Sequence, residues 1–227
     1  GPEAFEEISL RLAQFTRSLA NTQEDSAASR SAGGDPSSRV PSGFGIGTLE
    51  GLDAVPPAVI DTVTSLAFAV DAKDQYTQGH SRKVAAYAVL FCRALNLSDK
   101  QTAEIRLGGI LHDVGKVGIP ESILNKAGPL NAEEWETMKT HAALGAQLLE
   151  PLRYISAIQK TVKHHHEFFD GSGYPDKLTG AAIPLGARIV AIADAYDTIT
   201  SERTYKRARS TEDALAELAR CAGAQFD

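Results

Sequence analysis

Residues 110–116 read ILHDVGK, with a histidine and an aspartate between an apolar run and a glycine turn. The apolar run is typical of the end of a buried helix, so His112 and Asp113 would emerge from that end, just before Gly115. A charged side chain in such a place needs a partner. For an isolated His-Asp pair, the simplest interpretation is a hydrogen-bonded core histidine beside a capping aspartate. Other parts of the chain must decide whether the pair binds a metal.

Helical patterns surround this stretch on both sides. Prolines, capping-box spacings and apolar periodicity predict helices that begin near Pro56, Ser98 and Asn131, or that span about 80–96, 152–166, 186–200 and 211–222. Glycine and proline concentrate in 115–130 and 171–186, which predicts two long loops. No stretch alternates as a strand would. We therefore predict an all-α fold.

The N-terminal part of the chain has a different pattern. An apolar residue recurs every three or four positions, at Phe5, Ile8, Leu12, Phe15 and Leu19. This heptad spacing predicts a helix over 1–20 whose seam either packs on its own domain or pairs with a second copy or a signalling helix. Residues 21–55 are rich in Ser, Ala, Gly and Pro, which predicts a flexible linker. One domain is expected over 56–227.

Composition excludes several classes of protein. The net charge of −6 and the pI near 5.5 argue against a protein that coats a nucleic-acid polymer through a broad basic surface. No apolar run approaches the roughly 18 residues of a membrane span and no signal peptide is evident, so we expect a cytoplasmic protein without a membrane anchor. Cys92 and Cys221 lie in apolar helical patterns without CxxC spacing, which predicts two reduced, buried thiols.

All six histidines lie between His80 and His166, each in or beside a short motif. Imidazoles and carboxylates suit transition metals, and one carboxylate such as Asp113 can bridge two ions. His141 lies within a predicted helix, and Asp194 interrupts the apolar face of IVAIADAYD. Each residue alone is more often structural, but together they supply the ligands of a dinuclear hydrolase site.

Six motifs follow one another along the chain: HSRKV at 80–84, HDVGK at 112–116, IPESILNKAGPL at 119–130, HHEFFDGSGYP at 165–175, IPLGARIVAIADAYD at 183–197 and SERTYK at 201–206. Through these motifs, the chain from about residue 71 to residue 227 resembles the HD-GYP domain family, a branch of the HD phosphohydrolase superfamily that hydrolyses cyclic di-GMP. The resemblance implies an HD-type helical bundle with a GYP-containing loop, preceded by the N-terminal helix and linker. Lys83 stands where the family commonly has arginine, and the chain stops where the family usually continues.

The resemblance also implies the metal ligands. One divalent ion would be held by His80, His112, Asp113 and Asp194, and a second, bridged by Asp113, by His141, His165 and His166. Some members hold a third ion with a glutamate four residues before the position of His80, but Tyr76 stands there, so we expect two ions. His164 has no matching ligand role and is expected near the ligands or on the helix surface. Fe and Mn are the first candidates, and Ni and Zn also suit these ligands.

The resemblance assigns roles around the phosphate as well. Lys116 would lie against the phosphate and the attacking hydroxide, which makes Asp113 and Lys116 the candidate catalytic residues. Arg203 and Lys206 match residues that grip phosphates and guanine edges, and Tyr174 would stack on or hydrogen-bond to the substrate. Two acids are expected to orient ligand imidazoles, Glu167 and Asp170.

The leading hypothesis is a metal-dependent phosphodiesterase that ends a bacterial second-messenger signal. It would open cyclic di-GMP to linear pGpG through a metal-bridging hydroxide, with further hydrolysis to GMP left open. The alternatives are a catalytically weak cyclic di-GMP receptor or partner-binding module, a phosphodiesterase for a related cyclic dinucleotide such as cyclic GMP-AMP, and an HD triphosphatase. Expected partners are a second copy through the N-terminal helix, an upstream sensor domain and a diguanylate cyclase of the GGDEF type.

Overall fold

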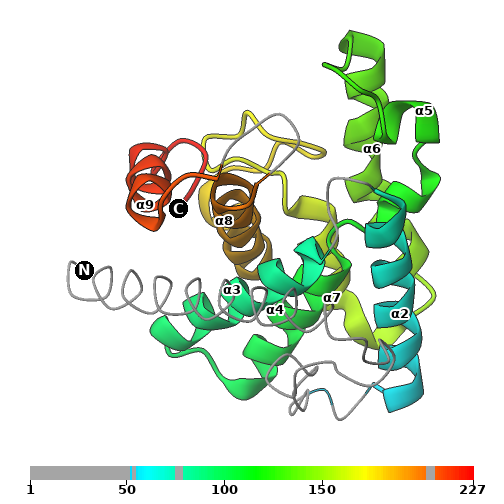
Figure 1. Cartoon of the computed structure of the whole chain (residues 1–227). Helices are drawn as coiled ribbons and strands as arrows, with labels where there is room; N and C mark the ends of the chain where they lie inside the picture. Colours follow the sequence, from blue (N-terminus) through cyan, green and yellow to red (C-terminus); the bar gives the residue numbers. More distant parts are fainter. Residues whose placement is uncertain (1–51, 53–54, 75–78, 203–207) are drawn as a thin grey trace, which may run out of the picture.

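The computed structural model of the chain describes residues 52, 55–74, 79–202 and 208–227 (Figure 1). Over these residues the regular secondary structure is helical, and an isolated bridge between Ala222 and Phe226 is the one β-type pairing. The prediction of an all-α fold is therefore confirmed. The predicted helix over 1–20 and the predicted linker up to residue 51 lie outside the described residues.

The helices are α2 (Pro57–Lys73), α3 (His80–Ala94), α4 (Asp99–Leu111), α5 (Glu121–Leu124), α6 (Ala132–Leu149), α7 (Ser156–His164), α8 (Leu185–Thr200) and α9 (Thr211–Arg220). Three 3-10 turns accompany them, η1 (Val114–Gly118), η2 (Arg153–Ile155) and η3 (Gly180–Ala182). The capping boxes predicted for α4 and α6 are both formed, by Ser98 with Gln101 and by Asn131 with Glu134. Local sequence therefore determines where these two helices begin.

Two predicted segments differ from the structure. The predicted loop 115–130 contains η1 and α5, and it buries Ile119 and Leu124. A segment that buries apolar side chains must also pair its backbone groups, and short helical turns do so locally. The predicted helix 152–166 begins later, at Ser156, because the chain first makes the turn η2, in which Ile155 is buried.

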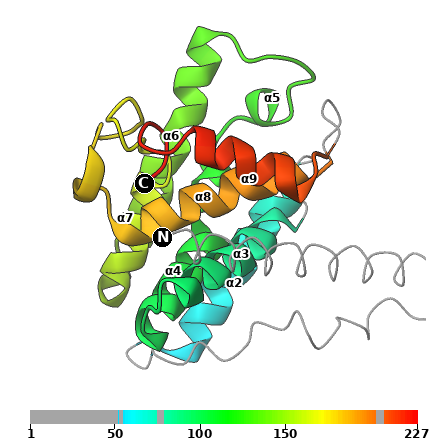
Figure 2. The ribbon, with the colours of Figure 1, turned by 90° about the vertical axis from the view of Figure 1, so that its left-hand side faces the viewer.

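Helix α4 packs against α2, α3, α7 and α8. In Figure 2, α9 lies along α8, and α3 and α4 lie below them. One apolar cluster surrounds the edge-to-face pair of Tyr87 and Tyr196 and joins α3, α8 and α9. A second cluster surrounds Leu107 and Leu111 and joins α4 to α2 and α7. Figure 1 shows α2 and α9 on opposite sides of the bundle.

The packing begins slightly before the first described helix. Leu52 and Val55 are buried and belong to the cluster around Leu107. These two residues fall in the segment predicted as linker, so the packing of the domain reaches at least to Leu52. The division of the chain into helix, linker and domain stays a prediction.

One of the two cysteines is buried as predicted, and the other is not. Cys92 is fully buried as predicted, and burial raises the pKa of its thiol to about 11. Cys221 is partly exposed, so the prediction of a buried thiol there is wrong; it caps the end of α9, a helix covered on one face only. Both are free thiols. Within the described ranges, no helix is both long and apolar enough for a bilayer span.

Candidate metal centre

Seven histidine and aspartate side chains converge from five helices. They lie at the start of α3 (His80), at the end of α4 (His112 and Asp113), within α6 (His141), just after α7 (His165 and His166) and within α8 (Asp194). All are buried except His166 and Asp194, which are partly exposed. The cluster thus combines residues at or just beyond the ends of three helices with residues from the interior of α6 and α8.

The seven side chains form two groups around a shared aspartate. In the first ligand group, one ligand atom each of His80, His112 and Asp194 lies within 4.8 Å of the others. The second ligand group, formed by His141, His165 and His166, satisfies the same limit. Each group has the size and the donor atoms of a metal site.

Asp113 lies between the two ligand groups. Its Oδ2 is 3.4 Å from His112 Nε2, and its Oδ1 is 3.3 Å from His141 Nε2. The two oxygens of one carboxylate thus face one histidine of each group. This is the arrangement that a bridging carboxylate requires.

Backbone carbonyls orient three of the imidazoles. Each Nδ1–H donates to a carbonyl three residues earlier, His112 to Gly109 (2.8 Å), His141 to Met138 (2.8 Å) and His165 to Val162 (2.7 Å). Because each Nδ1–H is held in this way, the Nε2 atom of each ring is directed at the cluster. The imidazoles are therefore positioned as ligands before any ion binds.

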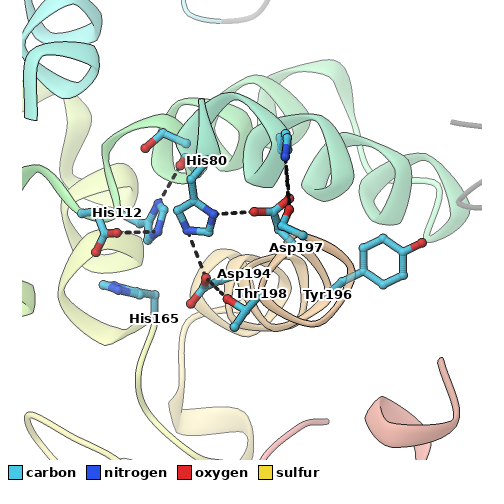
Figure 3. A network of polar contacts seen from close by, with 12 residues as sticks. His80, His112, His165, Asp194, Tyr196, Asp197 and Thr198 are labelled. Carbon is cyan, nitrogen blue, oxygen red and sulfur yellow. Dashed lines mark hydrogen bonds and ion pairs between the residues drawn. The ribbon is translucent and has the colours of Figure 1, made fainter. Parts of the chain in front are cut away.

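His80 is oriented by a side chain instead. Its Nδ1 lies 2.7 Å from Asp197 Oδ2, and its Nε2 lies 3.1 Å from Asp194 Oδ1 (Figure 3). The second Asp197 oxygen accepts from the Ser201 hydroxyl at 3.0 Å. Lys83 Nζ donates to the same hydroxyl at 3.1 Å, which ties α3 to the end of α8. Asp197 is thus a buried acid that holds a candidate ligand in place.

Burial and neighbouring charges set the protonation states of the two groups. Burial disfavours the charged form of His80, but hydrogen bonds to Asp194 and Asp197 outweigh it and raise its pKa to about 10. Burial, helped by neighbouring imidazoles, lowers the pKa of His166 to about 3 and holds that of His165 well below its usual value. The second ligand group is therefore neutral at pH 7, whereas a metal at the first group has to displace a proton from His80.

Lys116 lies at the edge of the cluster, as predicted from the HDVGK motif. Its Nζ is 2.8 Å from Asp113 Oδ2 and 2.9 Å from Asp74 Oδ2. Although burial disfavours the ammonium, these two carboxylates raise the pKa of Lys116 above its ordinary value. Lys116 is therefore a fixed positive charge beside the proposed bridging carboxylate.

The GYP loop, residues 171–179 between α7 and η3, lies next to the second ligand group. The ring of Tyr174 stacks on His166 at 4.9 Å between centroids and 28° between planes. The loop is tight: a Cβ at Gly173 would lie 2.2 Å from the Phe168 nitrogen, so only glycine fits. Glycine here lets the chain turn back, and the Tyr174 amide then donates to the His166 carbonyl at 3.1 Å.

Two acids expected to orient ligand imidazoles have other partners. Both Glu167 oxygens accept from backbone amides of the GYP loop, those of Asp176 at 2.7 Å and Leu178 at 3.1 Å. Asp170 accepts from the amide and hydroxyl of Ser172, a local turn contact. The expectation was wrong because turn amides left unpaired by the fold bond the nearest carboxylates. The two acids instead shape the loop that carries Tyr174.

Other predicted residues lie apart from the cluster or beyond the described ranges. His164 is buried, and its Nε2 lies 3.0 Å from Asp176 of the GYP loop, so the helix-surface interpretation is wrong. Tyr76, Arg203 and Lys206 fall outside the described residues.

Sequence reasoning missed two acids, Asp74 and Asp197. Asp197 had a local signal, since it follows Asp194 by three residues and therefore shares its helix face. Asp74 had none, because its contact with Lys116 spans 42 residues.

The donor set suits divalent transition metals. Imidazole nitrogens and carboxylate oxygens bind Fe, Mn, Ni and Zn, and neither Cys92 nor Cys221 belongs to the described cluster. Comparison with known proteins agrees with this chemistry. The family model of the HD domain matches residues 65–227. The chain belongs to the HD domain family.

Curated relatives of this HD domain extend the comparison. The 3'3'-cGAMP-specific phosphodiesterase 3 of Vibrio cholerae serotype O1 is 40% identical over 154 residues, covering 68% of this chain and 34% of the relative. The cyclic di-GMP phosphodiesterase response regulator RpfG of Xanthomonas campestris pv. campestris is 41% identical over 169 residues, covering 74% and 45%. The chain thus spans less than half the length of either relative, and the resemblance indicated by its motifs is confirmed.

A solved structure shows the same fold. The crystal structure of a cyclic GMP-AMP specific phosphodiesterase from V. cholerae aligns with a TM-score of 0.59 and 22% sequence identity. The alignment covers 74% of this chain and 45% of that one. The helical bundle of this HD domain is therefore an established fold, and as a member of the family it carries a divalent metal site for which its two ligand groups are the candidates.

Proposed function

We propose that this HD domain hydrolyses the phosphodiester of a cyclic dinucleotide, opening cyclic di-GMP to linear pGpG. The observation that carries the proposal is the convergence of seven histidine and aspartate side chains around Asp113, with Lys116 beside it. Relatives at about 40% identity are named as phosphodiesterases of cyclic di-GMP and of 3'3'-cGAMP, in agreement with it.

The two ligand groups would hold two divalent ions, Fe or Mn first, with Ni and Zn as the alternatives. When bound, such ions lower the pKa of a water and offset charge on the phosphate. Asp113 supports a pair of ions because its oxygens face both groups. The hydrogen-bonded imidazoles need no rearrangement to bind them.

The residues of the chain supply the remaining steps. Lys116 would donate to a phosphate oxygen and stabilise the negative charge that grows in the transition state. Asp74 would hold the ammonium at that place. Arg203 and Lys206 would grip the phosphates and guanine edges of the substrate before reaction. Tyr174 would contact the substrate from the GYP loop.

A second candidate substrate is 3'3'-cyclic GMP-AMP, since relatives similar to this chain are named for each dinucleotide. A catalytically weak receptor is less well supported, because every predicted ligand and Lys116 are present. Hydrolysis of pGpG to GMP would need a linear substrate to reach the same ligands. Product identification separates these possibilities.

The same proposal includes action in the cytoplasm and pairing of two copies through the helix predicted over 1–20. It also includes an upstream sensor and a GGDEF-type cyclase partner. Their support is the heptad spacing near the N-terminus and the signalling role of the substrate. The residues concerned lie outside the described ranges.

Metal analysis of anaerobically purified protein, coupled to turnover of both dinucleotides with product identification, tests the proposal. We expect two ions per chain and hydrolysis that a chelator stops. Asp113→Ala should lose both turnover and stable binding of the pair, because it removes the carboxylate shared by the two groups. Near-normal turnover by an Asp113→Ala protein that retains two ions would contradict it.

A further inference from the structure

Trp135 is the one tryptophan of the chain and lies in the first turn of α6, where it is 48% exposed. Exposed aromatic residues are ordinary when they stand alone, so exposure by itself carries no conclusion. Trp135, however, lines a cavity of about 380 Å³ together with His165, His166 and Asp194. A partly exposed indole therefore shares one hollow with three candidate metal ligands.

The surface between Trp135 and the ligands is continuous. Tyr174 lines the same cavity and stacks on His166. Lys139 follows Trp135 by four residues on α6, and its Nζ lies 5.8 Å from the centroid of the Tyr174 ring. Residues four apart share one face of a helix, so Trp135 and Lys139 lie on the face of α6 that meets the GYP loop.

The other walls of the cavity are mainly apolar, with Phe168, Ala195, Ile199 and Leu218 among them, and their charged residues are Arg209, Glu167 and Glu217. Such walls do not suit a phosphate, which the ligands and Lys116 would bind instead. They suit the faces of a flat heterocycle. The cavity thus combines an anion-binding end with an aromatic, apolar remainder, as a nucleotide requires.

We propose that Trp135 stacks on a nucleobase of the cyclic dinucleotide while the scissile phosphate lies at the ligand cluster; this rests on the proposed function and names a binding residue for it. Stacking recognises the π face of a base and not its hydrogen-bonding edge. Trp135 therefore contributes affinity for the dinucleotide without choosing between guanine and adenine.

Because the chain has a single tryptophan, its tryptophan fluorescence reports on Trp135 alone. Zn²⁺-loaded protein is titrated with a non-hydrolysable phosphorothioate analogue of cyclic di-GMP, with excitation at the red edge of tryptophan absorption, where guanine does not absorb. We expect saturable quenching of the emission from Trp135. Ribose 5-phosphate, which has a phosphate but no base, should cause none. Saturable binding of the analogue by calorimetry with unchanged emission would overturn the proposal.

Kinetics provides an independent readout. Trp135→Ala should raise KM by at least about fivefold with little change in kcat, and Trp135→Phe should restore most of the affinity. The increase should be alike for cyclic di-GMP and 3'3'-cyclic GMP-AMP. Tyr154→Ala is the matched control, because Tyr154 is an aromatic of similar exposure, at 46%, outside this cavity. An unchanged KM in Trp135→Ala would overturn the proposal.

The two proposals fail in different ways. If the metal-loaded chain hydrolyses no cyclic dinucleotide but the analogue quenches Trp135 saturably, the proposed reaction is wrong and the base-stacking site stands. If the chain hydrolyses cyclic di-GMP and Trp135→Ala matches the parent in KM and in analogue affinity, the reaction stands and the base-stacking site is wrong. Thermal unfolding of Trp135→Ala should match the parent, since Trp135 is half-exposed and belongs to neither apolar cluster.

Discussion

Lys116 is held between two carboxylates, and this geometry separates its role from that of the metal ligands. The ammonium is 2.8 Å from Asp113 and 2.9 Å from Asp74, so it is directed at the candidate metal centre and not at solvent. Lys116→Ala should chiefly lower kcat while metal content persists, because a group that acts mainly in the transition state leaves ground-state affinity unchanged. Steady-state kinetics with metal analysis checks this, and an unchanged kcat would count against the assignment.

A substitution at Asp197 tests whether a residue outside the two ligand groups affects metal affinity. Asp197 is the carboxylate that holds Nδ1 of His80, at 2.7 Å, while Nε2 faces the cluster. Asp197→Asn keeps the shape but removes the charge, and metal affinity should fall by roughly 10–100-fold. Competition with a chromophoric chelator measures it.

Tyr196→Phe is the control for the Asp197 substitution. Tyr196 is on the same helix, but its ring points away from the cluster and its hydroxyl meets Thr211 (Figure 3). We expect metal affinity in this variant to match the parent. Equal losses in the two variants would mean that α8 packing, and not Asp197, sets the affinity.

The contact between η1 and α6 is the element pairing that joins Asp113 to His141. A Cβ at Gly115 would lie 1.9 Å from the His141 carbonyl oxygen and 2.4 Å from the Gly145 nitrogen, both backbone atoms that cannot move aside. Gly115→Ala should therefore force the elements apart and destabilise the fold by about 1–3 kcal/mol or more. Denaturant unfolding measures the loss, and metal affinity should fall with it.

Gly118→Ala is the matched control within the same turn. A Cβ there would meet only the end of the Leu144 side chain, at 3.0 Å, and that side chain can rotate. We expect a much smaller loss of stability than in Gly115→Ala. Comparable losses would show that η1 tolerates no side chain for reasons other than a clash with the α6 backbone.

Across the whole domain, five helices contribute to one cluster, so ions that bind there should stabilise the folded bundle. An ion that binds the folded state alone adds about 2.7 kcal/mol when present at 100 times its Kd. Chelation should therefore lower Tm, and Mn²⁺ should restore it in a concentration-dependent way. Calorimetric scans of the full chain measure the shift, and a Tm indifferent to both treatments would exclude a metal shared by these helices.

Metal affinity should also depend on pH in a stated direction. The pKa of His80 is about 10 in the folded, metal-free chain, so its imidazole carries a proton at neutral pH that a metal has to displace. Raising the pH toward 10 removes this competition, and affinity at the first ligand group should rise by up to about tenfold per pH unit. Titration calorimetry in buffers of different ionisation enthalpy should detect the released proton. Binding without proton release at pH 7 would contradict the protonated His80.

Local sequence patterns predicted most of the helices, two capped helix starts and the identity of the candidate ligands. Periodicity and capping act within a few residues, so Ser98 and Asn131 mark their helices without help from the rest of the chain. The ligand motifs could also be predicted locally. Imidazoles and carboxylates at helix ends and on apolar helix faces need polar partners in any arrangement of the helices. The prediction of which ligands share an ion rested on the resemblance to the HD-GYP family, whose motifs occur here in the same order.

Which carboxylate supports which group depends on contacts between distant parts of the chain. Asp197 meets His80 across 117 residues, and Asp74 meets Lys116 across 42. Glu167 accepts from loop amides and not from a ligand imidazole, and Trp135 lines a cavity with three of the candidate ligands. These outcomes depend on how helices cross and how closely they approach, which follows from the packing of both apolar clusters at once. No local pattern contains that information.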